Sequence, residues 1–174
     1  MKIISVTDDL FDLLNDQELL HNKNRRPHVL ILKLTYKETK INFAVPFRSN
    51  IPPNANKLFY FSMPPRPSTK SKHRHGLHYI KAFPITSEYY AKCNIDDSKY
   101  YETIRKIANE KLTEIIHGMQ HYLELYEQGL REKYCVDIDS AIKKLNITLS
   151  NNAQYTIPNS VAAISETDNS NSLI

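Results

Sequence analysis

The stretch VLILKLTYKETKINFAVPF, residues 29–47, indicates the centre of the fold. Residues 29–34 form a nearly continuous apolar run, which is typical of a buried strand. From Ile41 onward, apolar side chains occupy every second position, which is the period of a half-buried strand. The polar residues between the two runs predict a turn at 36–39 and therefore an antiparallel hairpin. Pro46 has no backbone N–H to donate, so we expect the second strand to end there or to lie at an edge of the sheet.

Two more strands are expected on the C-terminal side of this hairpin. The first is the aromatic run KLFYFSM, residues 57–63, and the second is LHYIKAFPI, residues 77–85. Between them the segment PPRPSTKSKHRHG, residues 64–76, starts with prolines and predicts a basic loop. The first half of the chain should therefore contribute at least four strands to the sheet.

Helical patterns flank this β-rich part. Thr7 precedes two aspartates, which predicts a helix start, and we expect this helix to reach about Leu20. From 97 to 128, apolar residues recur every three or four positions, which predicts a long amphipathic helix with Gly129 as its stop. At about 1.5 Å per residue this helix would measure about 48 Å, so we expect a bend or a break near Gly118.

These patterns together predict an α+β fold, in which a compact, twisted antiparallel β-sheet is surrounded by helices. The long helix lies in the C-terminal half, and a short last helix is expected over 137–145. The chain has 174 residues, enough for one domain with a hydrophobic core, and we assign residues 1–150 to it. Residues 151–174 are rich in Asn and Ser, and they predict a polar, disordered tail.

Composition narrows the class of protein. Hydrophobic residues make up 41% of the chain and charged residues 24%, which is typical of a globular protein in water. No apolar run approaches the roughly 20 residues that cross a bilayer. The N-terminus shows no secretory signal, so we expect a cytoplasmic protein. The two cysteines, Cys93 and Cys135, have no redox-motif spacing. Three glycines are too few for Gly-rich phosphate loops, and no cofactor is expected.

Positive charge is concentrated in one interval of the chain. No Asp or Glu lies between Glu38 and Glu88. The cations of this interval are Lys40, Arg48, Lys57, Arg66, Lys70, Lys72, Arg74 and Lys81. The interval therefore carries +8, and because the whole chain carries +4, the remainder carries −4. Such an acid-free block predicts contact with a polyanion such as nucleic acid. The alternative is a solvated basic face without a partner.

Three histidines, His73, His75 and His78, lie among the cations of the predicted basic loop. Histidine is the usual proton carrier near neutral pH, and neighbouring cations lower its pKa, which favours the role of a base. The same H-x-H-x-x-H spacing could hold a metal ion. However, no Asp accompanies it, and the nearby cations would oppose a divalent ion. We therefore expect no metal site here.

The order of these segments resembles the ToxN/TenpN-like toxins of type III toxin–antitoxin systems, over roughly residues 1–147. One shared feature is a strand that ends in Pro, an apolar residue, Arg or Thr, and Ser; here these are Pro46, Phe47, Arg48 and Ser49. Another is a Gly-apolar-x-x-x-Lys strand; here its residues are Gly76, Leu77 and Lys81. The helical segment YYETIRKIANEKL, residues 100–112, fits the same order.

The resemblance implies a sequence-preferring, metal-independent endoribonuclease toxin that leaves a 2′,3′-cyclic phosphate and takes part in phage defence. It also implies inhibition by a small structured antitoxin RNA, with toxin and RNA assembled into closed rings. The sequence departs from ToxN at one point. Ile51 and two prolines follow Ser49, whereas ToxN has a Lys two residues after the matching serine.

RNA cleavage of this kind uses the 2′-OH of the RNA as nucleophile, so it needs a cation near the phosphate and groups that move protons. We expect Arg48 to neutralise the phosphate and Ser49 to donate a hydrogen bond to it, and strand alternation turns Arg48 away from the apolar face. The expected catalytic residues are Arg48, Ser49, His75 and Lys81. The expected RNA-binding residues are Arg25, Arg26, Lys57, Lys70, Lys72, His73 and Arg74. The alternative is a non-catalytic basic module that binds RNA or single-stranded DNA.

Overall fold

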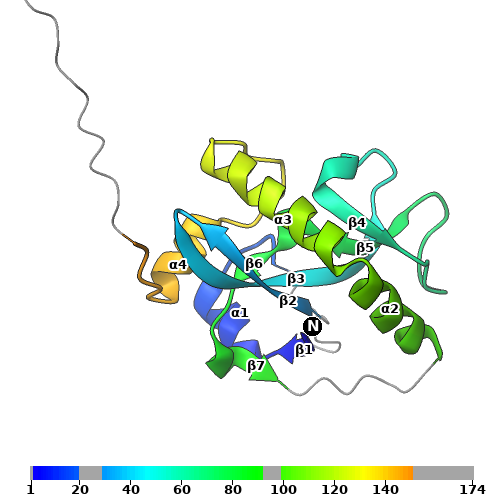
Figure 1. Cartoon of the computed structure of the whole chain (residues 1–174), viewed down its shortest axis with the longest axis horizontal. Coiled ribbons are helices and arrows are strands. Elements are labelled where there is room, and N and C mark those ends of the chain that lie inside the picture. The colour runs from blue at the N-terminus through cyan, green and yellow to red at the C-terminus, as the bar shows by residue number, and fades with distance from the viewer. Residues whose placement is uncertain (1, 20–28, 92–98, 151–174) are drawn as a thin grey trace, which may run out of the picture.

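The computed structural model describes residues 2–19, 29–91 and 99–150 (Figure 1). The strands are β1 (Lys2–Val6), β2 (Val29–Tyr36), β3 (Thr39–Ile51), β4 (Tyr60–Met63), β5 (Arg74–His78), β6 (Phe83–Pro84) and β7 (Tyr90–Ala91). The α-helices are α1 (Asp8–Leu14), α2 (Lys99–Glu110), α3 (Leu112–Glu127) and α4 (Ile138–Lys144). The described residues also form the 3-10 turns η1 (Lys57–Phe59), η2 (Tyr79–Lys81) and η3 (Ser87–Tyr89).

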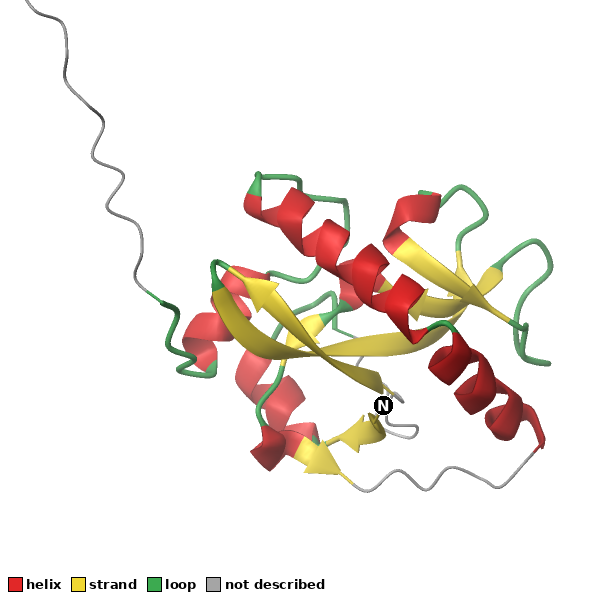
Figure 2. Cartoon of the chain, in the orientation of Figure 1, coloured by secondary structure: helices red, strands yellow, loops and turns green. Residues whose placement is uncertain are grey.

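The strands form one seven-stranded sheet in which every pair is antiparallel. Its order is β4-β5-β3-β2-β1-β7, and β6 pairs with β3 beside β5. α2 and α3 cross one face of the sheet, whereas α1 and α4 lie towards the other (Figure 2). The expected α+β class, with an antiparallel sheet and surrounding helices, is confirmed.

The hairpin at the centre of the sheet is the predicted one. β2 and β3 pair from Tyr36↔Thr39 to Val29↔Pro46. The two turn residues, Lys37 and Glu38, have positive φ values of 45° and 62°, as a tight hairpin turn requires. The prediction that the strand ends at Pro46 or lies at an edge was wrong. β3 continues to Ile51, and Pro46 lies where its outer neighbour changes from β6 to β5. At this changeover the missing N–H is tolerated.

The sheet is buried on both faces in its middle. Leu30, Phe43 and Val45 belong to a large core beneath α2 and α3. Val29 and Ala44 point to the opposite side and join a second core with α1 and α4. The expectation of a half-buried strand is therefore wrong for the middle of β3, because a small alanine can face a packed core as well as solvent.

The long helical pattern is divided into two helices. α2 ends at Glu110 and α3 begins at Leu112, so the break lies at Lys111 and not near Gly118 as expected. Gly118 lies within α3 instead, where an added Cβ would stand 2.8 Å from the Tyr79 hydroxyl. The missing side chain lets α3 pack closely on η2. Gly129, with φ 98°, follows α3 as predicted.

Other elements are shorter than their sequence patterns. α1 ends at Leu14, because Asn15 takes the left-handed conformation, so it does not reach Leu20. The run 57–63 begins with the 3-10 turn η1 before β4. The run 77–85 is interrupted by η2. Lys81 therefore lies in a 3-10 turn and not in a strand.

The short last helix is confirmed as α4, whose N-cap Asp137 accepts a hydrogen bond from the Ser140 backbone N–H at 2.9 Å. Within the described ranges no helix is long and apolar enough to span a bilayer. The predicted tail 151–174 and Cys93 lie outside the described residues.

Candidate functional site

A cleft of about 580 Å³ opens beside the C-terminal half of β3. Five parts of the chain meet there: the loop after α1, the end of β3 with the following loop, η1, the β5–η2 junction, and the loop after α3. The lining residues are Glu18, Arg48, Asn50, Pro52, Asn54, Ala55, Asn56, Phe59, His78, Ile80, Lys81, Glu132, Lys133 and Tyr134. We refer to this space as the cleft.

Arg48 and His78 form a pair in the cleft. Arg48 is opposite Gly76 in the β3–β5 ladder, and His78 lies two residues farther along β5, so both side chains are on the same face. Arg48 Nη1 is 3.2 Å from His78 Nδ1. Since a guanidinium can only donate, Nδ1 of His78 must accept, and the proton of the neutral ring is then on Nε2.

The surroundings keep His78 uncharged. Its side chain is buried, with 3% of the residue exposed. Burial, together with the positive charges of Arg48 and Lys81, lowers the pKa of His78 to about 3. Burial also lowers the pKa of Arg48, and the carboxylate of Glu18 partly raises it. His78 therefore accepts a hydrogen bond from Arg48 at neutral pH and does not carry a second positive charge.

Lys81 and Glu18 form the second pair in the cleft. Lys81 Nζ donates to Glu18 Oε2 at 2.6 Å and to the Glu18 backbone carbonyl at 3.0 Å. The lysine side chain is 7% exposed and the glutamate side chain 34% exposed. The buried ammonium is thus neutralised by a carboxylate that remains open to the cleft. Glu18 was not among the residues selected from the sequence, because it belongs to no motif and lies 63 residues before Lys81.

His75, expected to be catalytic, lies on the other face of β5. It is 2% exposed, and its ring stacks on Phe47 with centroids 6.4 Å apart. His75 Nδ1 is 2.8 Å from the Pro64 carbonyl oxygen and 3.0 Å from the Tyr100 hydroxyl. Burial lowers its pKa. The sheet therefore separates His75 from Arg48, and the structure brings His78 to Arg48 in its place.

Ser49 and Asn50 lie at an irregularity in β3. Arg48 pairs with Gly76 and Ile51 with Arg74, so β3 has one residue more than β5 over this distance. Such a bulge redirects side chains from strict alternation. Asn50 lines the cleft, and its side-chain oxygen accepts a hydrogen bond from the Lys70 backbone N–H at 2.9 Å. The basic loop is thereby attached to the strand that carries Arg48 and Ser49.

None of the expected RNA-binding residues that the structure describes is among the residues that line the cleft. Lys57, Lys70, Lys72 and Arg74 are exposed, and His73 is half-buried with Nδ1 3.0 Å from the Ser71 carbonyl oxygen. Arg25 and Arg26 lie outside the described residues. Tyr134, at the edge of the cleft, is 58% exposed, and the Lys133 ammonium lies 4.8 Å from its ring centroid. No sequence pattern had pointed to Tyr134.

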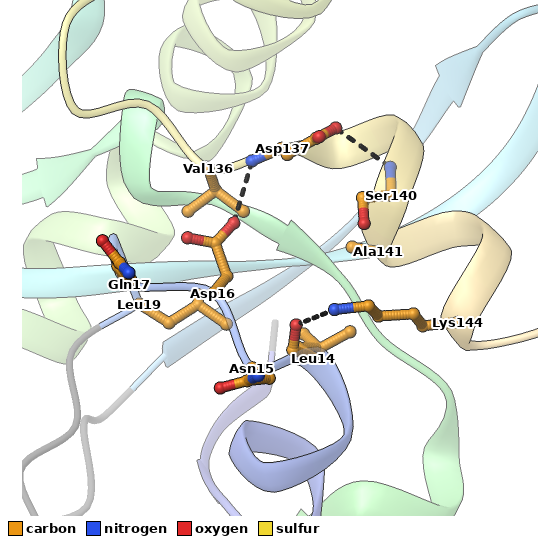
Figure 3. A pocket seen from close by; sticks show the side chains of 10 residues that line it. All are labelled: Leu14, Asn15, Asp16, Gln17, Leu19, Val136, Asp137, Ser140, Ala141 and Lys144. Atoms are coloured by element: carbon orange, nitrogen blue, oxygen red, sulfur yellow. Dashed lines mark hydrogen bonds between the residues drawn. The ribbon is translucent and has the colours of Figure 1, made fainter.

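A second pocket of about 210 Å³ lies between the loop after α1 and α4 (Figure 3). Its polar groups satisfy one another. Asp16 accepts from the Asp137 backbone N–H at 3.0 Å, and the Lys144 ammonium donates to the Leu14 carbonyl (Figure 3). These contacts attach α4 to the loop that carries Glu18. Because these contacts join two elements of the fold, we assign the pocket a structural role.

Among the described residues, no group of three or more His, Cys, Asp or Glu side chains is arranged to hold a metal ion. Of the two carboxylates that line the cleft, Glu18 is paired with the Lys81 ammonium. The lining of the cleft combines the cations Arg48, Lys81 and Lys133 with the carboxylates of Glu18 and Glu132.

Comparison with known proteins gives matches in structure only. No protein-family model matches the sequence, and no curated protein matches it. A chain of a bacterial antiviral system that is regulated by a processed non-coding RNA has a TM-score of 0.62 at 12% identity, covering 84% of this chain and 98% of that chain. A chain of a bacterial type III toxin–antitoxin system, in which a non-coding RNA pseudoknot selectively inhibits the toxin, has a TM-score of 0.50 at 14% identity, covering 83% and 95%.

The fold is that of the ToxN-type toxins. At 12% and 14% identity the likeness concerns the fold, and it agrees with the family resemblance of the sequence. In this ToxN-type fold, β3 brings Arg48 of the Pro46–Ser49 segment into the cleft, whereas Phe47 packs with His75 on the other face. β5 brings Gly76 and His78 alongside Arg48.

Proposed function

We propose that this protein is the toxin of a type III toxin–antitoxin system and that it cleaves RNA in the cytoplasm without a metal ion. The observation that carries the proposal is the Arg48–His78 pair, in a cleft of a ToxN-type fold and in an acid-free interval of the chain. A phosphodiester in the cleft would meet fixed cations and hydrogen-bond donors, which is what an anionic transition state requires.

The chemistry would use the 2′-OH of the RNA. Its oxygen attacks the adjacent phosphorus, and the bond to the 5′-oxygen breaks, leaving a 2′,3′-cyclic phosphate. Arg48 would neutralise the phosphorane with its planar guanidinium, and Ser49 would donate to a phosphate oxygen. His78 would hold Arg48 through Nδ1 and present Nε2–H to the cleft. In this proposal His78 takes the place in the site that the sequence had suggested for His75.

The same surface would bind RNA. The Lys70–Asn50 hydrogen bond attaches the basic loop, with its exposed cations, to the strand that carries Arg48. Tyr134 offers a face on which an unstacked base can lie. We propose that a small structured antitoxin RNA covers this surface, in closed rings with the toxin, and that cellular or phage RNA is the substrate. Support comes from the two fold neighbours, one regulated and one inhibited by non-coding RNA.

Incubation of the purified protein with a long mixed-sequence transcript in EDTA tests the proposal. We expect cleavage, with 2′,3′-cyclic phosphate ends that phosphatase removes only after the ring is opened. Cleavage that EDTA abolishes and magnesium restores would overturn the metal-independent mechanism. Salt-sensitive binding without any cleavage would favour the alternative, a basic module that holds RNA.

A further inference from the structure

Glu18 is the carboxylate best placed to take part in the reaction of the cleft. Lys81 holds both its side chain and its backbone carbonyl, at 2.6 Å and 3.0 Å. The residue lines the cleft, and its charge acts on Arg48 across it. Glu18 is therefore fixed in position, although it stands in a loop and not in a helix or strand.

Proton acceptors are scarce in the cleft. The charged and titratable groups that line it with Glu18 come from β3, β5, η2 and the loop after α3; they are Arg48, His78, Lys81, Glu132, Lys133 and Tyr134. Arginine and lysine side chains carry their protons at neutral pH. His78 uses Nδ1 for Arg48 and is a weak base, because its pKa is about 3. Of the two carboxylates that line the cleft, Glu18 is the one that contacts the buried Lys81 ammonium, and its charge also acts on Arg48.

We propose that Glu18 is the general base of the reaction, an inference that rests on the proposed ribonuclease function. Oε2 is held by Lys81, and Oε1 takes the proton of the 2′-OH. The 2′-oxygen forms its bond to phosphorus while the bond to the 5′-oxygen breaks. The 5′-oxygen takes a proton from a water molecule, and the resulting hydroxide removes the proton from Glu18. Lys81 is in this scheme a positioning residue for the carboxylate.

A purely electrostatic role for Glu18 is the competing explanation. A buried lysine needs an opposite charge, and removing that charge is strongly destabilising. Replacing Glu18 alone would then reduce activity because Lys81 is left unpaired. A double-mutant cycle separates the two roles, since an effect that acts only through Lys81 disappears once Lys81 is gone.

The experiment compares the wild type with Glu18→Gln, Lys81→Met and the double variant, and with Glu110→Gln as a matched control. Glu110 is on α2, 59% exposed, and outside the cleft. Single-turnover cleavage of a long mixed-sequence transcript, transcript binding and melting temperature are measured for each. We expect Glu18→Gln to lower the cleavage rate by about 10²- to 10⁴-fold, as for loss of a general base. Transcript binding should change by only a few-fold, and the control should cleave as the wild type does.

The double variant and the pH profile decide between the roles. If Glu18 is the base, removing it in the Lys81→Met background lowers the rate again by about 10²-fold or more, and the decline of the rate towards acidic pH is lost. If the Lys81→Met variant and the double variant cleave equally fast, Glu18 is only a counter-ion of Lys81 and the inference fails. If Glu18→Gln cleaves at the wild-type rate, the inference also fails while the ribonuclease function stands. If the wild type itself does not cleave, the proposed function fails first.

Discussion

At the scale of single residues, Arg48 is the side chain on which cleavage should depend most. Arg48→Ala removes a fixed donor from the developing phosphorane, and we expect the cleavage rate to fall by about 10²- to 10³-fold. Transcript binding should weaken much less, because seven other cations of the acid-free interval remain. Rates and affinities measured on the same transcript give the comparison.

Arg105→Ala is the matched control for this prediction, because Arg105 is exposed on α2 and lies outside the cleft. It should cleave normally. A folded Arg48→Ala protein that cleaves at the wild-type rate would remove Arg48 from the mechanism. If Ser49→Ala were equally harmless, the motif shared with the ToxN-type toxins would have no catalytic meaning in this chain.

His78 should make the stability of the protein depend on pH. Its folded pKa of about 3 lies below the value of about 6.5 that histidine has in an unfolded chain. As the pH falls below about 6.5, the unfolded chain binds a proton that the folded protein does not, so stability is lost. The loss should approach about 1.4 kcal/mol per pH unit for each such histidine. His75 should add to this loss of stability, because burial lowers its pKa in the folded protein as well.

Denaturant titrations between about pH 7 and pH 5 measure this slope, above the range in which most carboxylates titrate. His78→Gln should flatten the slope, because it removes the buried histidine whose folded pKa is lowered. An unfolding free energy that is the same throughout this range would show that His78 becomes protonated in the folded protein.

At the scale of elements, the junction of β4 and β5 should tolerate no side chain at position 76. A Cβ on Gly76 would lie 2.0 Å from the Phe61 carbonyl oxygen and 2.9 Å from its carbon, both in the backbone of the adjacent strand. We expect Gly76→Ala to destabilise the protein by about 3 kcal/mol, because the strands must separate. Because His78 and Arg48 are in the same ladder, cleavage should fall as well.

Gly129→Ala provides the comparison for Gly76. No atom lies within 4 Å of its added Cβ, although its φ of 98° is unfavourable for alanine. It should therefore lose only about 1 kcal/mol, from the backbone alone. Equal losses in the two variants, measured by chemical denaturation, would mean that close approach of β4 and β5 is not what requires Gly76.

Elements were predictable from the sequence where local patterns determine them. The hairpin of β2 and β3, the helix α4 and the glycine stop after α3 follow from side-chain period, capping and turn chemistry. The continuation of β3 past Pro46 and the break at Lys111 depend on which elements pack nearby, and no local pattern reports that. The candidate site was predictable only in part for the same reason. The sequence motif of β3 indicated Arg48, whereas Glu18 reaches the cleft only through tertiary structure.

At the scale of the whole molecule, the chain separates its charges, and RNA affinity should follow that separation. The basic loop is tied to Asn50 at the border of the cleft, and its exposed cations belong to the interval that carries +8. A triple variant with Lys70, Lys72 and Arg74 changed to Glu should bind RNA much more weakly. The logarithm of the RNA affinity of this variant should also fall less steeply with the logarithm of the salt concentration, because fewer counterions are released on binding.

The control places the same kind of change outside the cleft, on α2 and the α2–α3 junction. Lys106 and Lys111 lie on the exposed surface of α2 and of the α2–α3 junction, each in an exposed ion pair with a neighbouring glutamate. Changing both to Glu lowers the net charge of the molecule by four, compared with six for the loop variant, and neither residue lines the cleft. If net charge alone drew RNA to the protein, both variants would lose affinity in proportion to the charge removed. If the loop forms the RNA surface, the loop variant loses most of its affinity and salt dependence, and the helix variant retains both. Equal losses in the two variants would place the interface elsewhere on the molecule.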